Sequence, residues 1–566
     1  MTKSKWRMLL SMFALFAVFA IAVACGDDDD DDDDNGNGNG DDATATPSDL
    51  EPTGEIVIRG VQFETWDPHL SDFTQDISHF MKVWRGMYHL DNDDMPQPAM
   101  AEAEPEITND GKTYTITLKD GLLWSDGDDL KAEDFVWGIL RTCNPDTGGY
   151  YQSMFSNIVG CDDFYAAGDA SDAERQTLQD AVGVRAVDDL TVEINLLETQ
   201  PSFTTQLALW VAFPVPVHLL DSVGAEWPGP LDNVYNGPFM PTAYTEQSEI
   251  VLEPNPNWIG AGPGLAKVTI RYIDDISVAN QAYRTGEINA TAADLTQLAA
   301  LETEFGDELH EWASTITIGL EFNVAREPFD NPDVRVALSR ATNRDQMNEI
   351  VFSGANQMST NWAPPFRNGL EGGEYDEFIG YDEDAAKESL SDAGYPNGEG
   401  FPGFTMLLTD TASNKLLGEF LQAEWKRILN IDVDLEFVDS QTRSARFNES
   451  DYDLVAGGWG EDYPDPDNWF LGLWQTGGTY NKTNTSDPDL DAVIAAAQYN
   501  PNDEERREQY REAERILLET ANGIAPLYQR TNLYLVNPNI SGMVENKRGN
   551  EGFVPGDWSI EFWQLN

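Results

Sequence analysis

The sequence has few of the residues on which most enzyme sites depend. It contains three cysteines and five histidines in 566 residues. It has no G-x-S-x-G, H-E-x-x-H or G-x-x-x-x-G-K-S/T pattern, which excludes the signatures of serine hydrolases, zinc proteases and P-loop proteins. Residues 398–403 match G-x-G-x-x-G, but Pro402 interrupts the pattern and a predicted strand follows it, so dinucleotide binding is excluded. We expect no metal site and no cofactor.

Basic residues are scarce as well. Lys and Arg number 34 against 100 Asp and Glu, which gives a formal net charge of -66. Without the acids of residues 27–42 and three basic residues before them, 90 acids still face 31 bases. Such a body is repelled by nucleic acid and by anionic lipid, so we expect no nucleic-acid partner. Solubility in a salty or acidic habitat explains the acidity more simply than a specific cationic partner.

A long hydrophobic run lies near the N-terminus. Residues 1–24 have a basic start, an apolar stretch from 8 to 23 and small residues before Cys25, which predicts a secretory leader. Residues 22–26 resemble a bacterial lipobox, although Ala22 stands where Leu is usual, and this implies that Cys25 is lipidated. The alternative is a leader that is not cleaved and anchors the protein in the membrane. Its apolar run is just short of the ~20 residues that a membrane span needs. In both cases the body lies at the outer face of the cytoplasmic membrane, in the periplasm.

The next segment, residues 25–52, contains almost nothing that a core could bury, which predicts a disordered acidic linker. Cys143 and Cys161 are the other two cysteines. Because an exported protein lies in a compartment where thiols oxidise, we predict a disulfide between them. Closing that loop contributes roughly 3 kcal/mol on the chain-entropy model. A redox pair would more typically be Cys-x-x-Cys, and a zinc site needs more ligands.

Beyond the linker, strand and helix patterns alternate along the chain. Alternating apolar and polar residues predict strands near 55–60, 114–118, 186–196, 267–273, 431–438 and 453–456. Helical spacing predicts helices near 132–141, 280–286, 384–393, 415–429 and 503–520. This alternation predicts an α/β body, and the length suggests two or three domains.

One stretch, residues 459–466, combines the features of a binding loop. It follows a strand-like run whose glycines leave room for a ligand to approach the backbone. Trp459, Asp462 and Tyr463 arrive together at the end of the strand, and two prolines fix the direction of the loop. An aromatic wall beside a carboxylate suits an organic cation such as a primary amine. The alternative is an ordinary proline-rich loop with solvated acids.

This stretch resembles the GW-x-x-D-Y-x-D-P signature of the solute-binding proteins of ABC importers, of the oligopeptide, dipeptide and nickel type. Three further phrases agree with that family and stand in its order, at residues 110–135, 236–239 and 328–338. The resemblance covers about residues 53–566. It implies an α/β fold, a two-lobed periplasmic-binding-protein clamp with an extra subdomain and mixed sheets flanked by helices.

The resemblance also implies a division of the chain. After the signal peptide (1–24) and the lipidated linker (25–52), lobe I comprises 53–90, 192–313 and 529–566. Residues 91–191 form an inserted subdomain, and residues 314–528 form lobe II. The family's chain crosses between lobes near 315–323, where we expect a hinge.

The resemblance assigns roles to individual residues. In peptide-binding relatives the Asp that matches Asp462 pairs with the amino terminus of the ligand. Residues just before the family's first cleft phrase line its pocket, although a packing role for Phe63 is an equal alternative. Asn414, just after a predicted strand, is a further candidate. The candidate ligand contacts are Asp462, Trp459, Tyr463, Gln62, Phe63 and Asn414.

We therefore expect a monomeric, lipid-anchored receptor that captures an oligopeptide and presents it to an ABC permease, and not an enzyme. One residue departs from the family pattern: Ala456 stands where some peptide-binding members carry an Arg for the carboxylate of the ligand. Arg443 or Arg446 could replace that Arg.

Two alternatives remain open at the level of sequence. An oligosaccharide could stack on Trp459, Trp362 or Trp469, with Asp462 accepting hydroxyl protons. A secreted hydrolase is the more distant alternative, and a glycosidase would need two carboxylates ~5 to 9.5 Å apart across the scissile bond.

Overall fold

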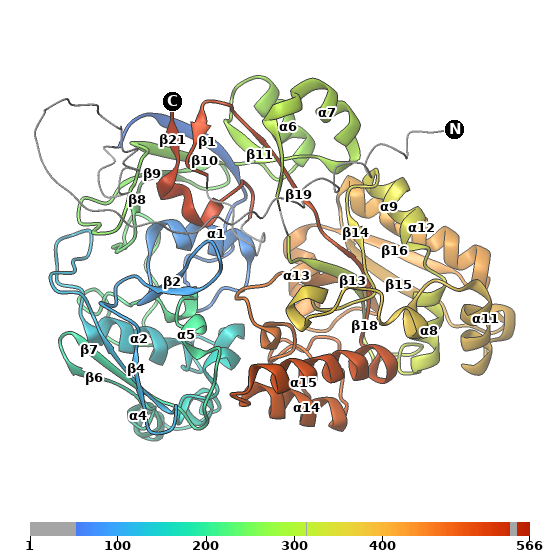
Figure 1. The fold of residues 1–566 in the computed structure, drawn as a ribbon, viewed down its shortest axis with the longest axis horizontal. Helices are drawn as coiled ribbons and strands as arrows, with labels where there is room; N and C mark the ends of the chain where they lie inside the picture. The colour runs from blue at the N-terminus through green and yellow to red at the C-terminus, as the bar shows by residue number, and fades with distance from the viewer. Residues whose placement is uncertain (1–51, 313, 544–551) are drawn as a thin grey trace, which may run out of the picture. The chain divides into compact units, whose positions relative to one another are not determined.

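The computed structural model describes residues 52–312, 314–543 and 552–566 (Figure 1). The predicted leader, Cys25 and nearly all of the acidic linker lie outside the described residues. Within the described ranges, no helix has the length and apolar character that crossing a bilayer requires.

The first large sheet joins the beginning and the end of the described chain. Its seven strands have the order β12-β19-β11-β1-β10-β9-β8. Their bounds are β1 (Glu55–Gly60), β8 (Phe239–Thr245), β9 (Glu249–Pro254), β10 (Lys267–Tyr272), β11 (Ala290–Ala292), β12 (Leu309–Trp312) and β19 (Asn532–Val536). Strand β1 runs parallel to β10 and β11, and Ile56 and Ile58 point into the core. Strand β19 inserts antiparallel between β11 and β12, so the red C-terminal strand lies among green ones in Figure 1.

The second large sheet is built from a continuous central part of the sequence. Its six strands have the order β14-β18-β13-β17-β15-β16. Their bounds are β13 (Thr317–Phe322), β14 (Gln357–Met358), β15 (Phe404–Thr409), β16 (Val433–Val438), β17 (Leu454–Trp459) and β18 (Ile524–Gln529). Residues 317–322, in the region where a hinge is expected, form β13 in the interior of this sheet. Strand β17 extends past the predicted residue 456 to Trp459 because it pairs with β13 over six residues.

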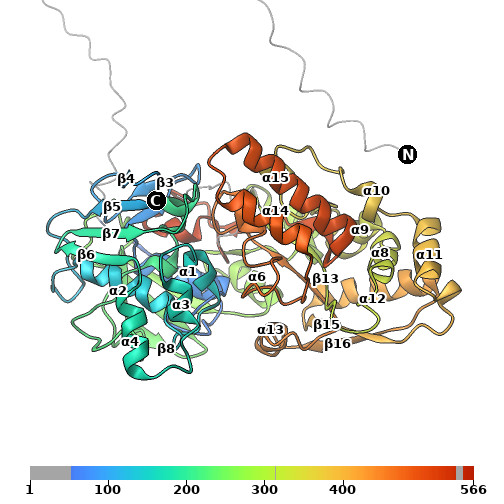
Figure 2. The same ribbon diagram turned by 90° about the horizontal axis from the view of Figure 1, so that it is seen from below.

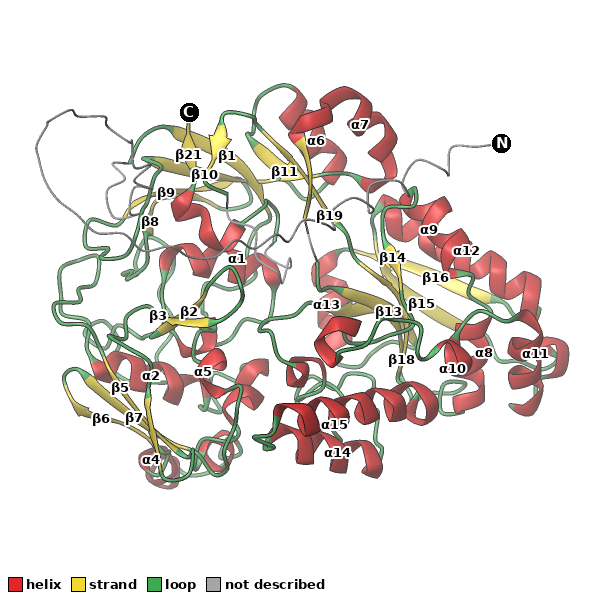
Figure 3. Cartoon of the chain, in the orientation of Figure 1, coloured by secondary structure: helices red, strands yellow, loops and turns green. Residues whose placement is uncertain are grey.

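Five helices accompany the second sheet (Figure 3), and four of them, α8, α9, α11 and α12, contribute to a hydrophobic core of its own. They are α8 (Pro332–Arg340), α9 (Arg344–Phe352), α11 (Glu383–Asp392), α12 (Ala412–Leu429) and α13 (Ser440–Asn448). Trp425 of α12 is fully buried in this core, and its indole N–H donates to the Leu338 carbonyl at 3.1 Å.

A third sheet has four strands in the order β4-β5-β7-β6, and it lies in the predicted inserted segment 91–191 except for β7, which runs past residue 191. Its bounds are β4 (Glu106–Thr108), β5 (Thr113–Thr117), β6 (Val184–Asp188) and β7 (Thr191–Asn195), and helix α2 (Ala132–Thr142) packs against it. Cys143 follows α2 directly, Cys161 begins α3 (Cys161–Tyr165), and the two residues form a disulfide.

The remaining elements are short, apart from the helix pair that follows the second sheet. Helices α14 (Pro488–Gln498) and α15 (Asp503–Ile516) pack side by side in both views (Figures 1 and 2). Helix α15 ends at Ile516 and passes into a π-helical turn, where the sequence predicted an α-helix to 520. The others are α1 (Thr74–Val83), α4 (Asp172–Asp180), α5 (Phe203–Gln206), α6 (Ile276–Arg284), α7 (Leu298–Phe305), α10 (Asp376–Ile379), β2 (Tyr88–Leu90), β3 (Pro96–Pro98), β20 (Ile540–Ser541) and β21 (Gln564–Leu565).

Candidate functional site

The loop after β17 is held by its own side chains. Asn468 uses one amide oxygen to accept hydrogen bonds from the Trp459 indole N–H and from the Asp462 backbone N–H, both at 3.0 Å. Asp465 caps the short 3-10 helix Pro466–Trp469 by accepting from the Asp467 N–H at 2.9 Å. The backbone path of the loop is therefore fixed without a ligand.

The glycines of β17 make room for protein and not for a ligand. A Cβ atom at Gly458 would lie 1.9 Å from the Thr317 carbonyl oxygen of β13, and one at Gly457 would lie 2.3 Å from a Glu321 carboxylate oxygen. The interpretation that the glycines admit a ligand to the backbone is therefore wrong for Gly458, because the backbone of the neighbouring strand fills that space.

Asp462 is 5% exposed, and its carboxylate meets a side chain from a distant part of the chain. Its Oδ2 accepts from the Tyr151 hydroxyl at 2.9 Å and from the Asn468 amide at 3.3 Å. Burial and the Asp462 carboxylate raise the pKa of Tyr151 well above its ordinary value, so its hydroxyl stays a donor at neutral pH. Two neutral donors thus orient the carboxylate.

A chain of aromatic ring contacts starts at Tyr151, which donates to this carboxylate. Trp459 stacks on Tyr151 with ring centroids 6.2 Å apart and an interplanar angle of 23°. Tyr480 meets Trp459 edge to face at 5.0 Å and Tyr150 at 6.5 Å. These four rings and Asp462 form what we call the Asp462 site: Trp459, Tyr150, Tyr151, Tyr480 and Asp462.

Three further hydrogen bonds tie the same two parts of the chain together. Ser202 donates to Asp467 at 2.6 Å, and Gln206 donates to the Tyr463 hydroxyl at 3.2 Å. Thr479 donates to the Tyr150 carbonyl at 2.9 Å. Tyr463 is fully buried, and its hydroxyl belongs to this junction.

The other acids of the loop have basic partners. Glu461 receives two hydrogen bonds from Arg367, at 2.7 and 2.5 Å, and Asp465 receives two from Arg506, at 2.7 and 2.6 Å. Arg506 also lies 3.2 Å from Asp467. These pairs give Glu461, Asp465 and Asp467 structural roles.

Charged residues that sequence reasoning missed lie beside the Asp462 site. Burial raises the pKa of Asp72 to about 6, and Lys482 opposes that shift. Lys482 lies over the Tyr150 ring at 4.7 Å from its centroid. Burial raises the pKa of Glu321 to about 7, against the attraction of Arg443. No local pattern marks Asp72 or Lys482, because their neighbours come from elsewhere in the sequence.

Gln62 and Phe63 belong to a different group of side chains. Phe63 packs against Trp66 at 4.9 Å and stacks on Tyr244 at 5.4 Å between ring centroids. Gln62 donates to the Tyr244 hydroxyl at 3.0 Å and accepts from the Gln247 N–H at 2.8 Å. The described hydrogen bonds and ring contacts of both residues stay within the part of the chain that forms the first sheet.

Asn414 also lies apart from the Asp462 site. It stands in the first turn of α12, where its amide donates to the Thr409 carbonyl at 3.1 Å. Its backbone N–H donates to the capping Thr411 hydroxyl at 3.2 Å. These contacts give Asn414 a role in starting the helix.

One group in the described residues has the composition of a metal site. Asp126, Asp128 and His218 bring one ligand atom each within 4.8 Å of one another. All three are exposed on a turn, and their hydrogen bond and ion pairs with one another account for the arrangement. They lie outside the Asp462 site.

A buried acid beneath the loop makes stability depend on pH. Glu514 accepts from the Trp362 N–H at 2.7 Å and from the Asn368 amide at 2.8 Å. Burial raises its pKa to about 7, with these hydrogen bonds opposing the shift. Because the pKa of Glu514 is higher in the folded than in the unfolded protein, its stabilisation is complete below its ordinary value of 4.5 and is lost as the pH rises through about 7.

We expect Glu514→Gln to reduce the fall in the free energy of unfolding between about pH 5 and pH 8 by on the order of 3 kcal/mol. Urea titrations of both proteins across that range measure the fall. Glu508→Gln, an exposed change on the same helix, is the control and should leave the pH dependence as it is. Parallel pH profiles for wild type and Glu514→Gln would contradict the assignment.

The chain is similar to known proteins along most of its length. Residues 95–481 match the model described as bacterial extracellular solute-binding proteins, family 5 Middle. The periplasmic oligopeptide-binding protein OppA of Escherichia coli is 27% identical over 493 residues, which cover 85% of this chain and 88% of that protein.

Two solved structures extend the comparison to the fold. A periplasmic oligopeptide-binding protein from Borrelia burgdorferi has 25% identity and a TM-score of 0.79, covering 89% of this chain and 100% of that one. The murein tripeptide binding protein MppA of Escherichia coli has 25% identity and a TM-score of 0.80, covering 89% and 99%. The predicted fold, a two-lobed α/β clamp of mixed sheets flanked by helices, is confirmed.

Proposed function

Because this chain belongs to the bacterial extracellular solute-binding proteins of family 5, we propose that it captures an oligopeptide between its two lobes and delivers it to an ABC permease. The observation that carries this proposal is the Asp462 site, a buried carboxylate that accepts from Tyr151 at the start of a chain of aromatic ring contacts. The hydrogen bond from Tyr151 to Asp462 joins residues 311 positions apart in the sequence.

The amino terminus of the peptide is the group that Asp462 receives. A primary ammonium forms a charge-assisted hydrogen bond with a carboxylate, and the faces of Trp459 and Tyr480 attract the same positive charge. Closure of the lobes excludes water, which strengthens an ion pair inside. Backbone hydrogen bonds along an extended peptide would explain tolerance of different side chains.

Arg443 binds the carboxylate end of the peptide. Arg446 is engaged by Glu436 at 2.8 Å and Asp451 at 3.3 Å. Arg443 instead donates to the Ala456 carbonyl at 3.1 Å, beside the position that carries an Arg in some peptide-binding relatives. Arg443 therefore supplies the positive charge that some peptide-binding relatives have at the position of Ala456.

The lobes of this proposal follow the division expected from the sequence. Residues 53–90, 192–313 and 529–566 form one lobe with the inserted segment 91–191, and residues 314–528 form the other. The protein works as a monomer, held by lipidated Cys25 at the outer face of the cytoplasmic membrane. The leader pattern of residues 1–25 supports this anchoring.

The structure disfavours the oligosaccharide alternative. Trp469 is fully buried and Trp362 is 2% exposed, and the Trp362 indole donates to the Trp469 carbonyl at 2.7 Å. The interpretation that either ring offers a sugar platform is wrong, because both belong to the core. The relatives are binding proteins, and we propose that this chain also binds without turnover.

Mass spectrometry of the molecules that the full chain retains tests the function. The protein is isolated without denaturation and exposed to a mixture of short peptides and oligosaccharides. The bound molecules are then released and identified. We expect peptides with free amino termini. Retention of saccharides alone, or of neither class, would contradict the proposal.

A further inference from the structure

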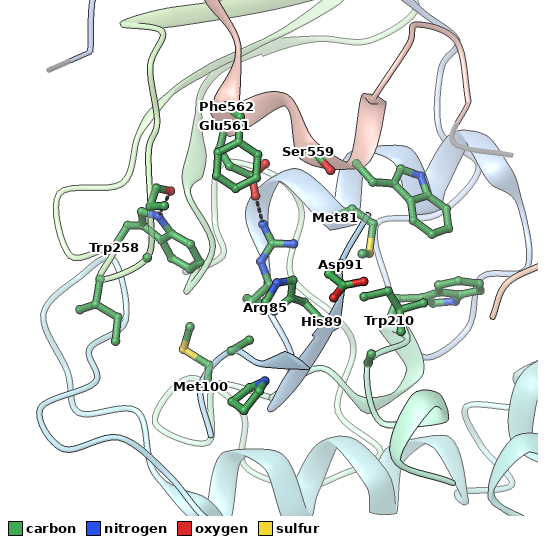
Figure 4. Close-up of a pocket in the computed structure, with 18 of the residues that line it drawn as sticks. Met81, Arg85, His89, Asp91, Met100, Trp210, Trp258, Ser559, Glu561 and Phe562 are labelled. Carbon is green, nitrogen blue, oxygen red and sulfur yellow. Dashed lines mark hydrogen bonds and ion pairs between the residues drawn. The ribbon is translucent and has the colours of Figure 1, made fainter. Parts of the chain in front are cut away.

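A cavity of about 500 Å³ lies in the part of the chain that forms the first sheet, away from the Asp462 site (Figure 4). Its size falls in the range of ~300 to 1,000 Å³ that is typical of small-molecule sites. We call it the Arg85 cavity. Its walls include Arg85, Met100, Lys119, Trp210, Trp258 and Glu561.

Trp210 separates this cavity from the Asp462 site. Its ring packs against Tyr151 of that site at 5.0 Å and against Trp558 of the cavity wall at 6.4 Å. Its indole N–H donates to the Ser71 carbonyl at 3.0 Å, which fixes the ring in place. The indole is fully buried, so the two sites are distinct compartments that share one wall.

The apolar part of the wall suits a flat ligand. Trp258 and Trp210 lie on opposite sides in Figure 4, with Phe562 at the top and Met100 at the bottom. Large aromatic faces and adaptable methionines are the side chains that bind planar apolar groups. A ligand here would have an aromatic or similarly flat body.

Arg85 provides the polar anchor. Its Nη2 donates to Glu561 at 2.6 Å, and its guanidinium lies 5.6 Å from the centroid of the Trp258 ring. Within the described part of the chain, its Nε and Nη1 have no hydrogen-bond partner, and protein atoms do not enclose them. Arg85 lines the cavity, so a ligand bound there can accept hydrogen bonds from these donors.

The wall holds two cations, Arg85 and Lys119, and two acids, Asp91 and Glu561. Lys119 lies in the same wall, where its ammonium donates to the Ala99 carbonyl at 2.5 Å. Asp91, an acid of the same wall, accepts hydrogen bonds from two backbone N–H groups and from the Gln97 amide. These hydrogen bonds hold the Asp91 carboxylate within its own turn. Burial, Arg85 and Lys119 lower the pKa of His89 to about 4, so this imidazole is neutral at neutral pH.

We propose that the Arg85 cavity binds a small amphipathic anion with a flat apolar body, such as an aromatic carboxylate, at a site distinct from the Asp462 site. The carboxylate contacts Arg85 and Lys119, and the ring packs against Trp258. This ligand need not be the transported solute, because it occupies a compartment within one lobe.

Calorimetry of the full chain with 2-naphthoate tests the proposal, with 2-naphthamide as the neutral match. We expect one saturable site that binds 2-naphthoate about tenfold more tightly than the amide, because the Arg85 hydrogen bonds are charge-assisted only for the acid. Lys119→Gln should weaken the acid about fivefold and leave the amide unchanged.

Variants at exposed positions separate this site from other modes of binding. Ile259, 50% exposed, lines the cavity, and Ile259→Glu should weaken 2-naphthoate about tenfold by placing a like charge beside the anion. Ile350→Glu, on α9 and 54% exposed, is the matched control and should have no effect. Trp459→Ala should also leave 2-naphthoate binding unchanged. No saturable binding, equal affinity for acid and amide, unchanged binding in Ile259→Glu, or loss in Trp459→Ala would each overturn the proposal.

Discussion

Replacing Asp462 by Asn should weaken the binding of peptides with a free amino terminus by ~2 to 5 kcal/mol. The buried carboxylate supplies the charge that an ammonium needs once closure has removed water, and an amide of the same shape cannot replace it. Tyr151 and Asn468 still have an oxygen to donate to in the variant, so we expect the fold of the loop to survive. Calorimetry with a tripeptide measures the loss.

The control ligand is the same peptide with an acetylated amino terminus. The acetylated peptide has no ammonium, so its weaker binding should be nearly the same in wild type and Asp462→Asn. Asp434→Asn, an exposed change on β16, removes the same charge far from the rings and should leave both affinities as they are. An equal loss for both peptides in Asp462→Asn would show that Asp462 supports the structure and does not meet the ligand's amine.

Replacing Arg506 by Met should lower the free energy of unfolding by ~3 to 5 kcal/mol at about pH 8. Arg506 is 4% exposed, donates twice to Asp465 and lies 3.2 Å from Asp467. Without it, acids in a buried loop lose their cation. Burial raises the pKa of Asp467 to about 8, with Asp465 adding to the shift, so the loss should be smaller near pH 5, where the carboxylates can take up protons.

Urea titrations at both pH values measure the effect of Arg506→Met. Arg507→Met is a close control, because Arg507 is the next residue of the same helix and is exposed. The variant should also bind peptide less tightly, since Asp465 caps the 3-10 helix whose Asn468 holds Asp462 in place. Equal stability of the two variants would contradict the structural role of the Arg506 pairs.

The sequence predicts a binding role for the loop after β17 but not the residues that complete the Asp462 site. Trp459 and Asp462 stand in one short phrase, so a local motif was enough to find them. Tyr151 lies 311 positions from Asp462, and nothing in the sequence near Tyr151 indicates that contact. A local pattern identifies the polar and aromatic residues of a loop, whereas tertiary packing determines which distant residues contact them.

The same limit applies to the other residues of the loop. Tyr463 stands next to Asp462 in the sequence, yet a hydrogen bond from Gln206 and full burial place its ring in the junction. Three acids in one loop look alike in the sequence, and the structure shows that Glu461 accepts from Arg367 and that Asp465 accepts from Arg506. Alternation predicted β1 and β10 of the first sheet and β16 and β17 of the second, whereas the order of the strands depends on crossovers that leave no local pattern.

The structure of the full chain in complex with a tripeptide tests the central claim most directly. The account predicts that the amino nitrogen of the peptide lies within ~3 Å of an Asp462 carboxylate oxygen, between the rings of Trp459 and Tyr480. A peptide bound with its amine beside another acid, or outside the space between the lobes, would contradict it.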